Sequence, residues 1–154
     1  MKKRKKLSEK TSKIIYKQII EGIKYIHSQN IVDRDIKLEN INNNIKICDF
    51  WVGIMINQNS ILYDQCGTQF YIAPEIIKNE GYIDFLVDIW SSDIALYILL
   101  TGNFPFNQPK LNDLQYEILN TLFKKIILSH WKQIIYFKEF YAKILIKDFL
   151  LMIF

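Results

Sequence analysis

The hydrophobic residues near the start of the chain repeat with the period of an α-helix. Four isoleucines share one face at helical spacing, namely Ile15, Ile19, Ile23 and Ile26. Ser8 stands where an N-cap is preferred, and Glu9 follows in the first turn, where a negative charge interacts favourably with the helix dipole. The pattern predicts a helix that starts after Ser8 and ends at Asn30.

The chain after this helix alternates short apolar stretches with polar loops. Ile31-Val32 and the run from Ile45 to Cys48 are predicted as two short extended pieces of a β-hairpin, joined across a polar loop. Residues 50–75 show no sustained periodicity, which predicts a long loop. Long loops inside compact domains usually carry function, so we expect part of the site here.

A second long helix is predicted from about Asp84 to Thr101, and it is apolar nearly all round, which indicates burial. The segment Gly102 to Phe106 ends it. Two further helices are predicted near residues 111–128 and 136–152. The predicted fold class is therefore mainly α with a small β-hairpin.

Composition and charge divide the chain into a short tail and one domain. The 154 residues are 50% hydrophobic and 14% aromatic, enough for a buried core and unlike a disordered chain. The net charge of +4 comes from the basic run Lys2 to Lys6, because the rest holds 15 of the 20 basic residues against 16 acidic ones. We assign residues 1–6 as a basic tail and residues 7–154 to the domain. For the tail, we favour a solvated terminus over a nuclear-localisation or nucleic-acid patch.

The cysteines and the apolar runs predict the compartment. Cys48 and Cys66 have no metal-ligand spacing and suit a reducing environment. No apolar run approaches the ~18 residues of a membrane span, and no apolar stretch follows the basic start as it would in a signal peptide. We expect a soluble intracellular protein, cytoplasmic in the first place and nuclear as the alternative, with no membrane and no nucleic acid as partner.

The chemistry of the chain is concentrated in the segment Asp33 to Asn40. Asp35 can accept a hydroxyl proton, Lys37 can neutralise a phosphate, and the amide oxygen of Asn40 is a ligand that Mg²⁺ accepts. Asp49 adds a second such oxygen at the end of an extended run. Taken singly, each of these side chains has a plain structural interpretation, as a turn residue or a surface lysine.

Taken together, five segments in matching order resemble the large lobe of a eukaryotic protein kinase of the Ser/Thr type, most like the calmodulin-dependent kinases. Lys37 is the Ser/Thr-type marker. The five segments are the helix from Ser8 to His27, VDRDIKLEN, IKICDF, CGTQFYIAPE and DIWSSDIALYILLTGNFPF.

The resemblance implies roles in transfer of the ATP γ-phosphate to a protein Ser/Thr hydroxyl. Asp35 would accept or orient the hydroxyl proton, and Lys37 would neutralise the transferring phosphate. Asn40 and Asp49 would hold Mg²⁺, and Glu39 would lie near substrate or ribose. The implied cofactors are ATP and Mg²⁺, although binding by this chain alone is in doubt, and the implied partner is a protein substrate or binding partner.

The resemblance also implies an activation segment that ends at Glu75. Arg34 would pair with a negative group on this segment, and Thr68 would bridge to the catalytic residues. Asp64 stands two residues before Cys66, where related kinases often carry a phosphorylated Thr. We interpret Asp64 as a fixed carboxylate that pairs with Arg34 without modification, or else as an ordinary exposed loop residue.

Four positions depart from the family pattern. Asp33 stands where the family has His or Tyr, and a charge in the core needs a partner or a raised pKa. Trp51 replaces the Gly after Phe50, and we expect it to crowd the metal site or to hold the segment in one state. Gln69 replaces a Pro, and Asp93 replaces a Gly inside the buried helix, where a carboxylate is costly unless paired.

The resemblance covers the large lobe alone, and we expect a kinase domain truncated at both ends. The glycine-rich loop and the Lys that contacts the ATP phosphates are not found upstream of Ser8. The chain ends in the apolar run Leu150 to Phe154, and Glu75 lacks a partner because the only arginines are Arg4 and Arg34.

Three interpretations of function follow from these observations. The first is a Ser/Thr protein kinase domain that is inactive as this isolated chain. The second is a non-catalytic pseudokinase lobe that binds a protein partner, and the third is a truncated product without function. Intact Asp35, Lys37, Asn40 and Asp49 favour the first, whereas Asp33 and Trp51 favour the second.

Overall fold

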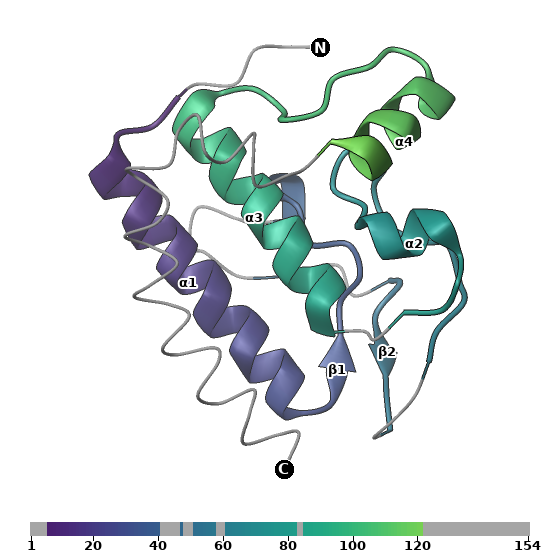
Figure 1. Ribbon diagram of the computed structural model, residues 1–154. Coiled ribbons are helices and arrows are strands. Elements are labelled where there is room, and N and C mark those ends of the chain that lie inside the picture. Colours follow the sequence, from purple (N-terminus) through teal and green to yellow (C-terminus); the bar gives the residue numbers. More distant parts are fainter. Residues whose placement is uncertain (1–5, 41–46, 48–50, 58–60, 83–84, 122–154) are drawn as a thin grey trace. The chain divides into compact units, whose positions relative to one another are not determined.

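The computed structural model describes residues 6–40, 47, 51–57, 61–82 and 85–121 (Figure 1). The chain divides into two compact units, Met1–Asn120 and Thr121–Phe154, and the fold below is that of the first unit. Its elements are α1 (Glu9–Ser28), β1 (Ile31–Val32), the 3-10 helix η1 (Leu38–Asn40), β2 (Ile54–Met55), α2 (Pro74–Lys78), α3 (Phe85–Thr101) and α4 (Leu111–Asn120). The described part is mainly helical with a small sheet, as the sequence predicts.

Helix α1 begins where its sequence pattern predicts, and it ends two residues before the predicted end at Asn30. The Ser8 hydroxyl accepts a hydrogen bond from the Thr11 amide at 3.1 Å, which caps the helix. Lys13 pairs with Glu9 at 2.9 Å one turn away. The helix ends at Ser28, and Asn30 takes a left-handed φ of 56° that turns the chain into β1.

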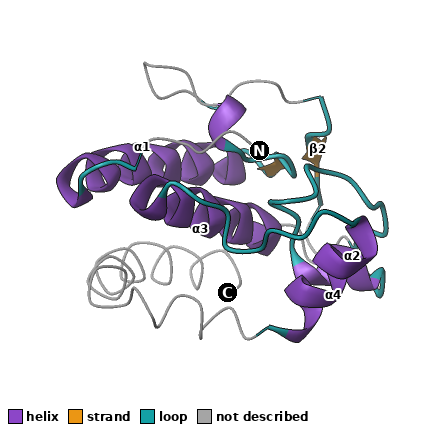
Figure 2. Cartoon of the chain, turned by 90° about the horizontal axis from the view of Figure 1, so that it is seen from above, coloured by secondary structure: helices purple, strands orange, loops and turns teal. Residues whose placement is uncertain are grey.

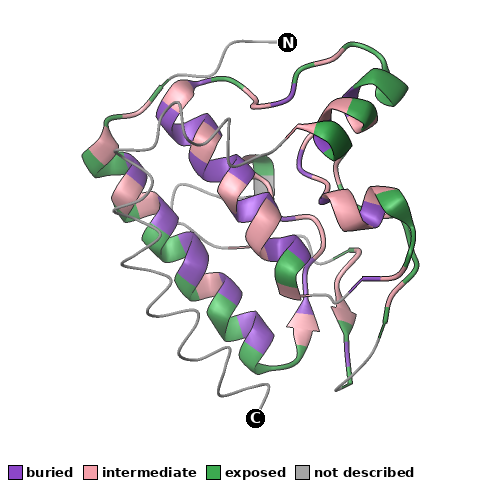
Figure 3. Ribbon diagram, viewed as in Figure 1, coloured by how far each residue is buried: buried purple, intermediate pink, exposed green. Residues whose placement is uncertain are grey.

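Helix α3 packs beside α1 (Figures 1 and 2), and in Figure 1 it runs between α1 on one side and α2 and α4 on the other. Most residues of α3 are buried, which confirms the prediction of a helix enclosed on nearly every side (Figure 3). Asp93 is the expected exception in this apolar helix, and it is paired, since the Tyr16 hydroxyl of α1 donates to its carboxylate at 2.9 Å. That bond offsets part of the cost of a carboxylate at this position.

The sheet is a single antiparallel pair in which Ile31 lies opposite Met55 and Val32 opposite Ile54. Strand β2 and the first two residues of α2 therefore lie inside the stretch 50–75 that the sequence predicts as a loop, so that prediction is wrong at these four residues. The predicted strand Ile45 to Cys48 is outside the described residues except for Ile47. A two-residue strand carries no periodicity, so sequence pattern has nothing to detect.

Of the two shorter helices, the sequence pattern predicts α4 and not α2. Helix α2 at Pro74–Lys78 was not predicted, because five residues are too few for a helical period, although Pro at its first position is a common start. Helix α4 begins at Leu111, as predicted, and is described to Asn120. The predicted helix 136–152 lies outside the described residues, and within the described part no helix is long and apolar enough to span a membrane.

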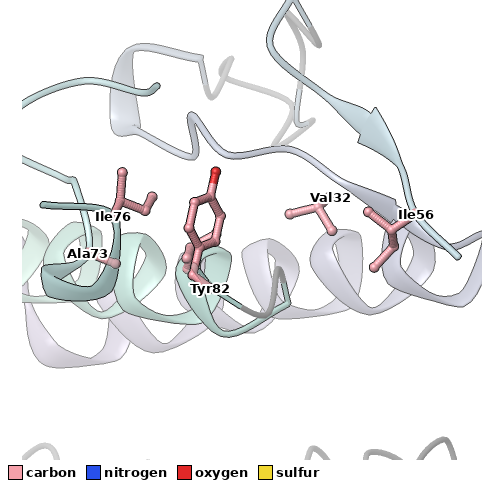
Figure 4. Close-up of a cluster of buried hydrophobic side chains, with 6 residues drawn as sticks. Val32, Ile56, Ala73, Ile76 and Tyr82 are labelled. Atoms are coloured by element: carbon pink, nitrogen blue, oxygen red, sulfur yellow. The ribbon is translucent and has the colours of Figure 1, made fainter. Parts of the chain in front are cut away.

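A buried hydrophobic cluster joins the sheet to the segment that precedes α3 (Figure 4). Its members come from β1, from the residue after β2, and from residues around α2 and the start of α3, namely Val32, Ile56, Ala73, Ile76, Tyr82 and Val87. Because this cluster ties the end of the activation segment to β1, it sets the position of the loop that leaves β1.

Candidate active site

One carboxylate on α3 anchors the loop that leaves β1. Asp88 is fully buried, and it accepts hydrogen bonds from His27 Nε2 at 2.8 Å, from the Asp33 amide at 3.0 Å and from the Arg34 amide at 2.8 Å. The Phe85 ring lies 4.5 Å from the His27 ring, centre to centre. A buried carboxylate is stable only when donors surround it, so Asp88 and the loop hold each other in place.

The loop itself makes a left-handed turn at Arg34, whose φ is 65°. The Asp33 carboxylate closes this turn, because its Oδ1 accepts from the Asp35 amide at 3.0 Å. Asp33 is only 1% exposed. The sequence predicts that a charge at this buried position needs a partner, and a main-chain amide two residues on is one such partner.

Asp35, Lys37 and Thr68 form a compact hydrogen-bonded group. The Thr68 amide and hydroxyl donate to Asp35 Oδ1 at 2.9 and 2.6 Å. Lys37 Nζ contacts the other carboxylate oxygen and also donates to the Thr68 hydroxyl at 2.9 Å. The structure thus brings together three residues that the sequence predicts as neighbours, across a separation of more than thirty positions.

A tyrosine that sequence reasoning missed holds the 3-10 helix η1 beside this group. The Tyr71 hydroxyl accepts from the Leu38 amide at 3.4 Å and donates to the Glu39 carboxylate at 3.1 Å. Ser91 of α3 in turn donates to the Tyr71 carbonyl at 2.9 Å. The Tyr71 side chain is buried. Its position in the apolar end of the activation segment gave no sign of this polar role.

Arg34 points from the loop toward the activation segment. Its Nε and one terminal nitrogen donate to the Val52 carbonyl at 2.8 and 2.6 Å. The other terminal nitrogen finds no hydrogen-bond acceptor within the described part, and lies 3.7 Å from the Asp64 carboxylate. This separation is an ion pair without a hydrogen bond. The Arg34 side chain is 9% exposed, whereas that of Asp64 is 77% exposed.

Two titratable groups lie close to Arg34. The Tyr82 hydroxyl donates to the Asp64 carbonyl at 2.8 Å, and burial raises the pKa of Tyr82 to about 12. Burial also raises the pKa of the Cys66 thiol, although the Arg34 guanidinium opposes that shift. Both groups therefore stay protonated at neutral pH, and Asp64 is the anion nearest to Arg34 among the described residues.

Gly67 lets the activation segment approach the loop closely. Its φ is 99°, and a Cβ at this position would lie 2.5 Å from the Arg34 carbonyl oxygen. Only glycine fits both this conformation and this distance. Thr68 follows directly, so the close approach at Gly67 is what delivers the Thr68 amide to Asp35.

The structure does not describe the side chains of the two predicted metal ligands. Asp49 and the side chain of Asn40 lie outside the described residues, so the Mg²⁺ site stays a prediction. In the described ranges no group of three or more Asp, Glu, His or Cys residues is placed to hold a metal ion. Trp51 is 91% exposed. Such a side chain projects into solvent, and the expectation that it crowds the metal site or holds its segment in one state stays a prediction, because residues 48–50 lie outside the described part.

The remaining predicted site residue makes no hydrogen bond to this group within the described part of the chain. Glu75 is on α2, and it forms no ion pair with any residue that the structure describes. The site residues that the structure does unite are Arg34, Asp35, Lys37 and Thr68, with Glu39 and Asp64 at its edges. Sequence reasoning missed His27, Asp88 and Tyr71 as positioning groups. A lone Asp at the start of an apolar buried helix is the signal that points to Asp88.

Comparisons with known proteins agree with this geometry. The model of the protein kinase domain family matches residues 1–151. The serine/threonine-protein kinase dkf-2 of Caenorhabditis briggsae is 39% identical over 136 residues, covering 84% of this chain and 11% of that protein. CBL-interacting protein kinase 17 of Oryza sativa subsp. japonica is 39% identical over 109 residues, covering 66% of this chain and 24% of that protein.

A third relative, CBL-interacting serine/threonine-protein kinase 5 of Arabidopsis thaliana, is 36% identical over 126 residues, with 77% of this chain and 28% of that protein covered. The chain therefore spans between 11% and 28% of the length of these relatives. The match to the family model extends over nearly the whole sequence, and all three relatives are protein kinases, two of them named as serine/threonine kinases. The chain belongs to the eukaryotic protein kinase family, and its resemblance is to the Ser/Thr kinases.

Proposed function

We propose that this chain carries the phosphoacceptor side of a Ser/Thr protein kinase site, where the γ-phosphate of ATP passes to a protein hydroxyl. The observation that carries the proposal is the hydrogen-bonded group of Asp35, Lys37 and Thr68. It places a carboxylate and an ammonium side by side on a loop fixed to a buried helix. Phosphoryl transfer needs such positioning and charge stabilisation more than covalent help from the protein.

Asp35 is suited to receive the substrate hydroxyl. Thr68 donates twice to Oδ1, while Lys37 contacts Oδ2. A carboxylate offers about four lone-pair sites, so it can hold several donors at once. The held carboxylate would accept a bond from the substrate Ser or Thr hydroxyl and turn its oxygen toward the phosphorus. Orientation of this kind can supply much of the rate of an enzyme.

Lys37 is suited to the transferring phosphate. An ammonium group has three donors, and two of them face Asp35 and Thr68. The third would bind an oxygen of the γ-phosphate and stabilise its charge as the bond to ATP breaks. Because its position depends on Thr68, the activation segment controls whether Lys37 is correctly placed.

The protein kinase family uses ATP and Mg²⁺, and we propose that this chain binds them through Asn40 and Asp49. An amide oxygen and a carboxylate are the hard ligands that Mg²⁺ prefers. When bound, Mg²⁺ with ATP supplies the phosphoryl group and neutralises its charge. The adjacent Lys37 ammonium gives the described side of the site the charge that a phosphate requires.

Asp64 gives the proposed kinase a fixed negative charge beside Arg34. The pair is 3.7 Å apart without any modification of the chain. A phosphorylated residue at such a position orders an activation segment through bonds to arginine. We propose that Asp64 performs part of this role permanently, with Tyr82 holding the Asp64 main chain by the bond to its carbonyl.

A second candidate function is a non-catalytic lobe that binds a protein partner. The observation that favours it is the exposure of two large apolar side chains within five residues, Trp51 at 91% and Met55 at 73%. Exposed apolar groups of this size mark interaction surfaces when they are contiguous. In this case the retained Asp35 group would be structural, and it would make no contribution to turnover.

The test of the proposal is phosphate transfer from labelled Mg²⁺–ATP to Ser/Thr peptides, together with thermal unfolding of the same protein. We expect Mg²⁺–ATP to raise the melting temperature of the unmodified chain, since a ligand that binds only the folded state stabilises it. Asp49→Asn should abolish that rise. Asp35→Asn should reduce transfer by about 10²–10⁴-fold while leaving the rise intact.

Matched controls separate a site effect from a general change of charge. Asp113→Asn on α4 and Lys78→Met on α2 alter exposed residues, and both should transfer phosphate like the unmodified chain. A rise in melting temperature without any transfer supports the partner-binding lobe. A cooperative transition that Mg²⁺–ATP leaves unmoved, with no transfer, overturns the proposed kinase function.

A further inference from the structure

Asp33 is the residue of the site whose identity departs most from the family, and its surroundings are specific. Its carboxylate lies in the core at 1% exposure, directly after β1. Its amide donates to Asp88 at 3.0 Å, and its Oδ1 accepts from the Asp35 amide at the same distance. A buried carboxylate is retained only where it makes bonds of this kind, so Asp33 is a connecting residue between α3 and Asp35.

The bond from Asp33 to Asp35 closes the left-handed turn at Arg34. A φ of 65° is unfavourable for a residue with a Cβ, and a side-chain bond from residue i to the amide of residue i+2 stabilises such a turn. The turn brings the Arg34 carbonyl against Gly67, where a Cβ would lie 2.5 Å away. The same turn presents the Asp35 carboxylate to Thr68.

We propose that Asp33 is a positioning residue of the phosphotransfer site, and that its carboxylate oxygen fixes the main chain of Asp35. The bonded path runs from Asp88 through Asp33 to Asp35 and then to Thr68. Its catalytic consequence rests on the proposed kinase function, whereas the structural part does not. Asp33 itself is 1% exposed, so its side chain acts on the site through Asp35 and not through a contact with substrate.

The property that matters in this proposal is the acceptor, not the charge. Asn has the same shape as Asp and keeps one oxygen at the Oδ1 position, so Asp33→Asn should keep the bond to the Asp35 amide. Leu has a similar size and no acceptor, so Asp33→Leu should lose it. Asp33→Leu fills most of the volume of the removed side chain, and Asp33→Ala, which leaves a cavity instead, is a second variant without an acceptor.

The deciding measurement is hydrogen exchange of the Asp35 amide by NMR, with core amides of α3 as the internal reference. We expect Asp33→Leu and Asp33→Ala to accelerate exchange at Asp35 at least tenfold relative to the reference, and Asp33→Asn to stay within about twofold of the unmodified chain. An unchanged Asp35 amide in folded Asp33→Leu overturns the proposal. Equal acceleration in Asp33→Asn does so too, because charge would then be the cause.

Two further readouts keep the test decisive. In the unmodified chain, a scalar coupling across the hydrogen bond between the Asp35 nitrogen and the Asp33 carboxyl carbon should be observed, and its absence overturns the proposal even if both apolar variants fail to fold. In phosphate transfer, the apolar variants should lose about 10²-fold in kcat with KM for ATP unchanged, and Asp33→Asn should restore it. Amide hydrogen exchange and the scalar coupling can be measured without enzymatic turnover. If the unmodified chain is inactive, that result refutes the proposed kinase function and leaves the structural role of Asp33 to be decided by these two measurements.

Discussion

Substitution of Asp88 tests whether one buried carboxylate organises the site. Its two oxygens accept from the His27 ring and from the amides of Asp33 and Arg34, at 2.8 to 3.0 Å. In Asp88→Ala all three donors lose their acceptor inside the core. In Asp88→Asn the side-chain oxygen can keep the hydrogen bonds from His27 and from the Asp33 amide. The new NH₂ group then faces the Arg34 amide, and because both groups are donors, that hydrogen bond is lost.

The expected losses follow from the cost of an unsatisfied buried group. Each orphaned donor costs about 1–3 kcal/mol, and removal of one partner from a buried charged contact costs about 3–5 kcal/mol in measured cases. We therefore expect Asp88→Ala to lower the free energy of unfolding by about 3–5 kcal/mol, and Asp88→Asn by about 1–3 kcal/mol. Small domains have about 5–15 kcal/mol in total, so the first variant stands near the limit of folding.

Urea unfolding followed by the fluorescence of Trp90, which is partly buried on α3 and stacked on Phe106, measures both losses. Asp113→Asn on exposed α4 is the control, and should change the free energy by less than about 1 kcal/mol. The slope against urea should stay constant if only native stability changes. A loss below about 1 kcal/mol in Asp88→Ala, less than the lowest cost of one orphaned donor, would refute the reasoning.

Three further outcomes are expected from the activation segment and from Tyr82, which donates a hydrogen bond to it. Gly67→Ala should lower the free energy of unfolding by about 1–3 kcal/mol, because φ is 99° and the new Cβ meets the Arg34 carbonyl; urea unfolding checks this, and unchanged stability contradicts it. Asp64→Ala should speed amide hydrogen exchange over residues 61–71 and leave exchange in α1 unchanged. If the variant and the unmodified chain exchange at equal rates over residues 61–71, the ion pair between Arg34 and Asp64 does not order this segment. Burial raises the pKa of Tyr82 to about 12, so its contribution to stability is complete below about pH 10 and is lost as the pH rises toward 12. Melting curves across that range should show a loss that Tyr82→Phe lacks.

The sequence predicts the fold where the pattern is long. Helices α1 and α3 carry twenty and seventeen residues, enough turns for a helical face in one case and for burial on all sides in the other. Strand β2 and helix α2 carry two and five residues, less than the window over which periodicity can be recognised. Their formation depends on tertiary contacts in the cluster that includes Val32 and Ile76, and such contacts leave no local pattern.

The candidate site divides in the same way. Lys37, Asp35 and Thr68 were predicted as neighbours, because their residue types and order carry the kinase resemblance. The roles of Tyr71 and Asp33 were not predictable, since both act through main-chain groups, and a side-chain pattern does not show where an amide will point. Sequence reasoning did identify Asp33 as a buried charge in need of a partner. It had no means to identify that partner as the amide of Asp35.

The hydrogen bonds to α3 explain how the loop that carries Asp35 can hold its side chains as firmly as a helix would. Sites built on rigid elements hold their geometry better than sites on loops, and here the loop depends on α3 at two points. Asp88 holds the main chain before Asp35, and Ser91, one turn further along α3, holds Tyr71 and through it η1. Since both contacts lie on one side of one buried helix, Asp35 and η1 cannot shift independently of each other without breaking a buried hydrogen bond. Helix α3 therefore sets the spacing between the Asp35 carboxylate and η1, the segment that carries Asn40.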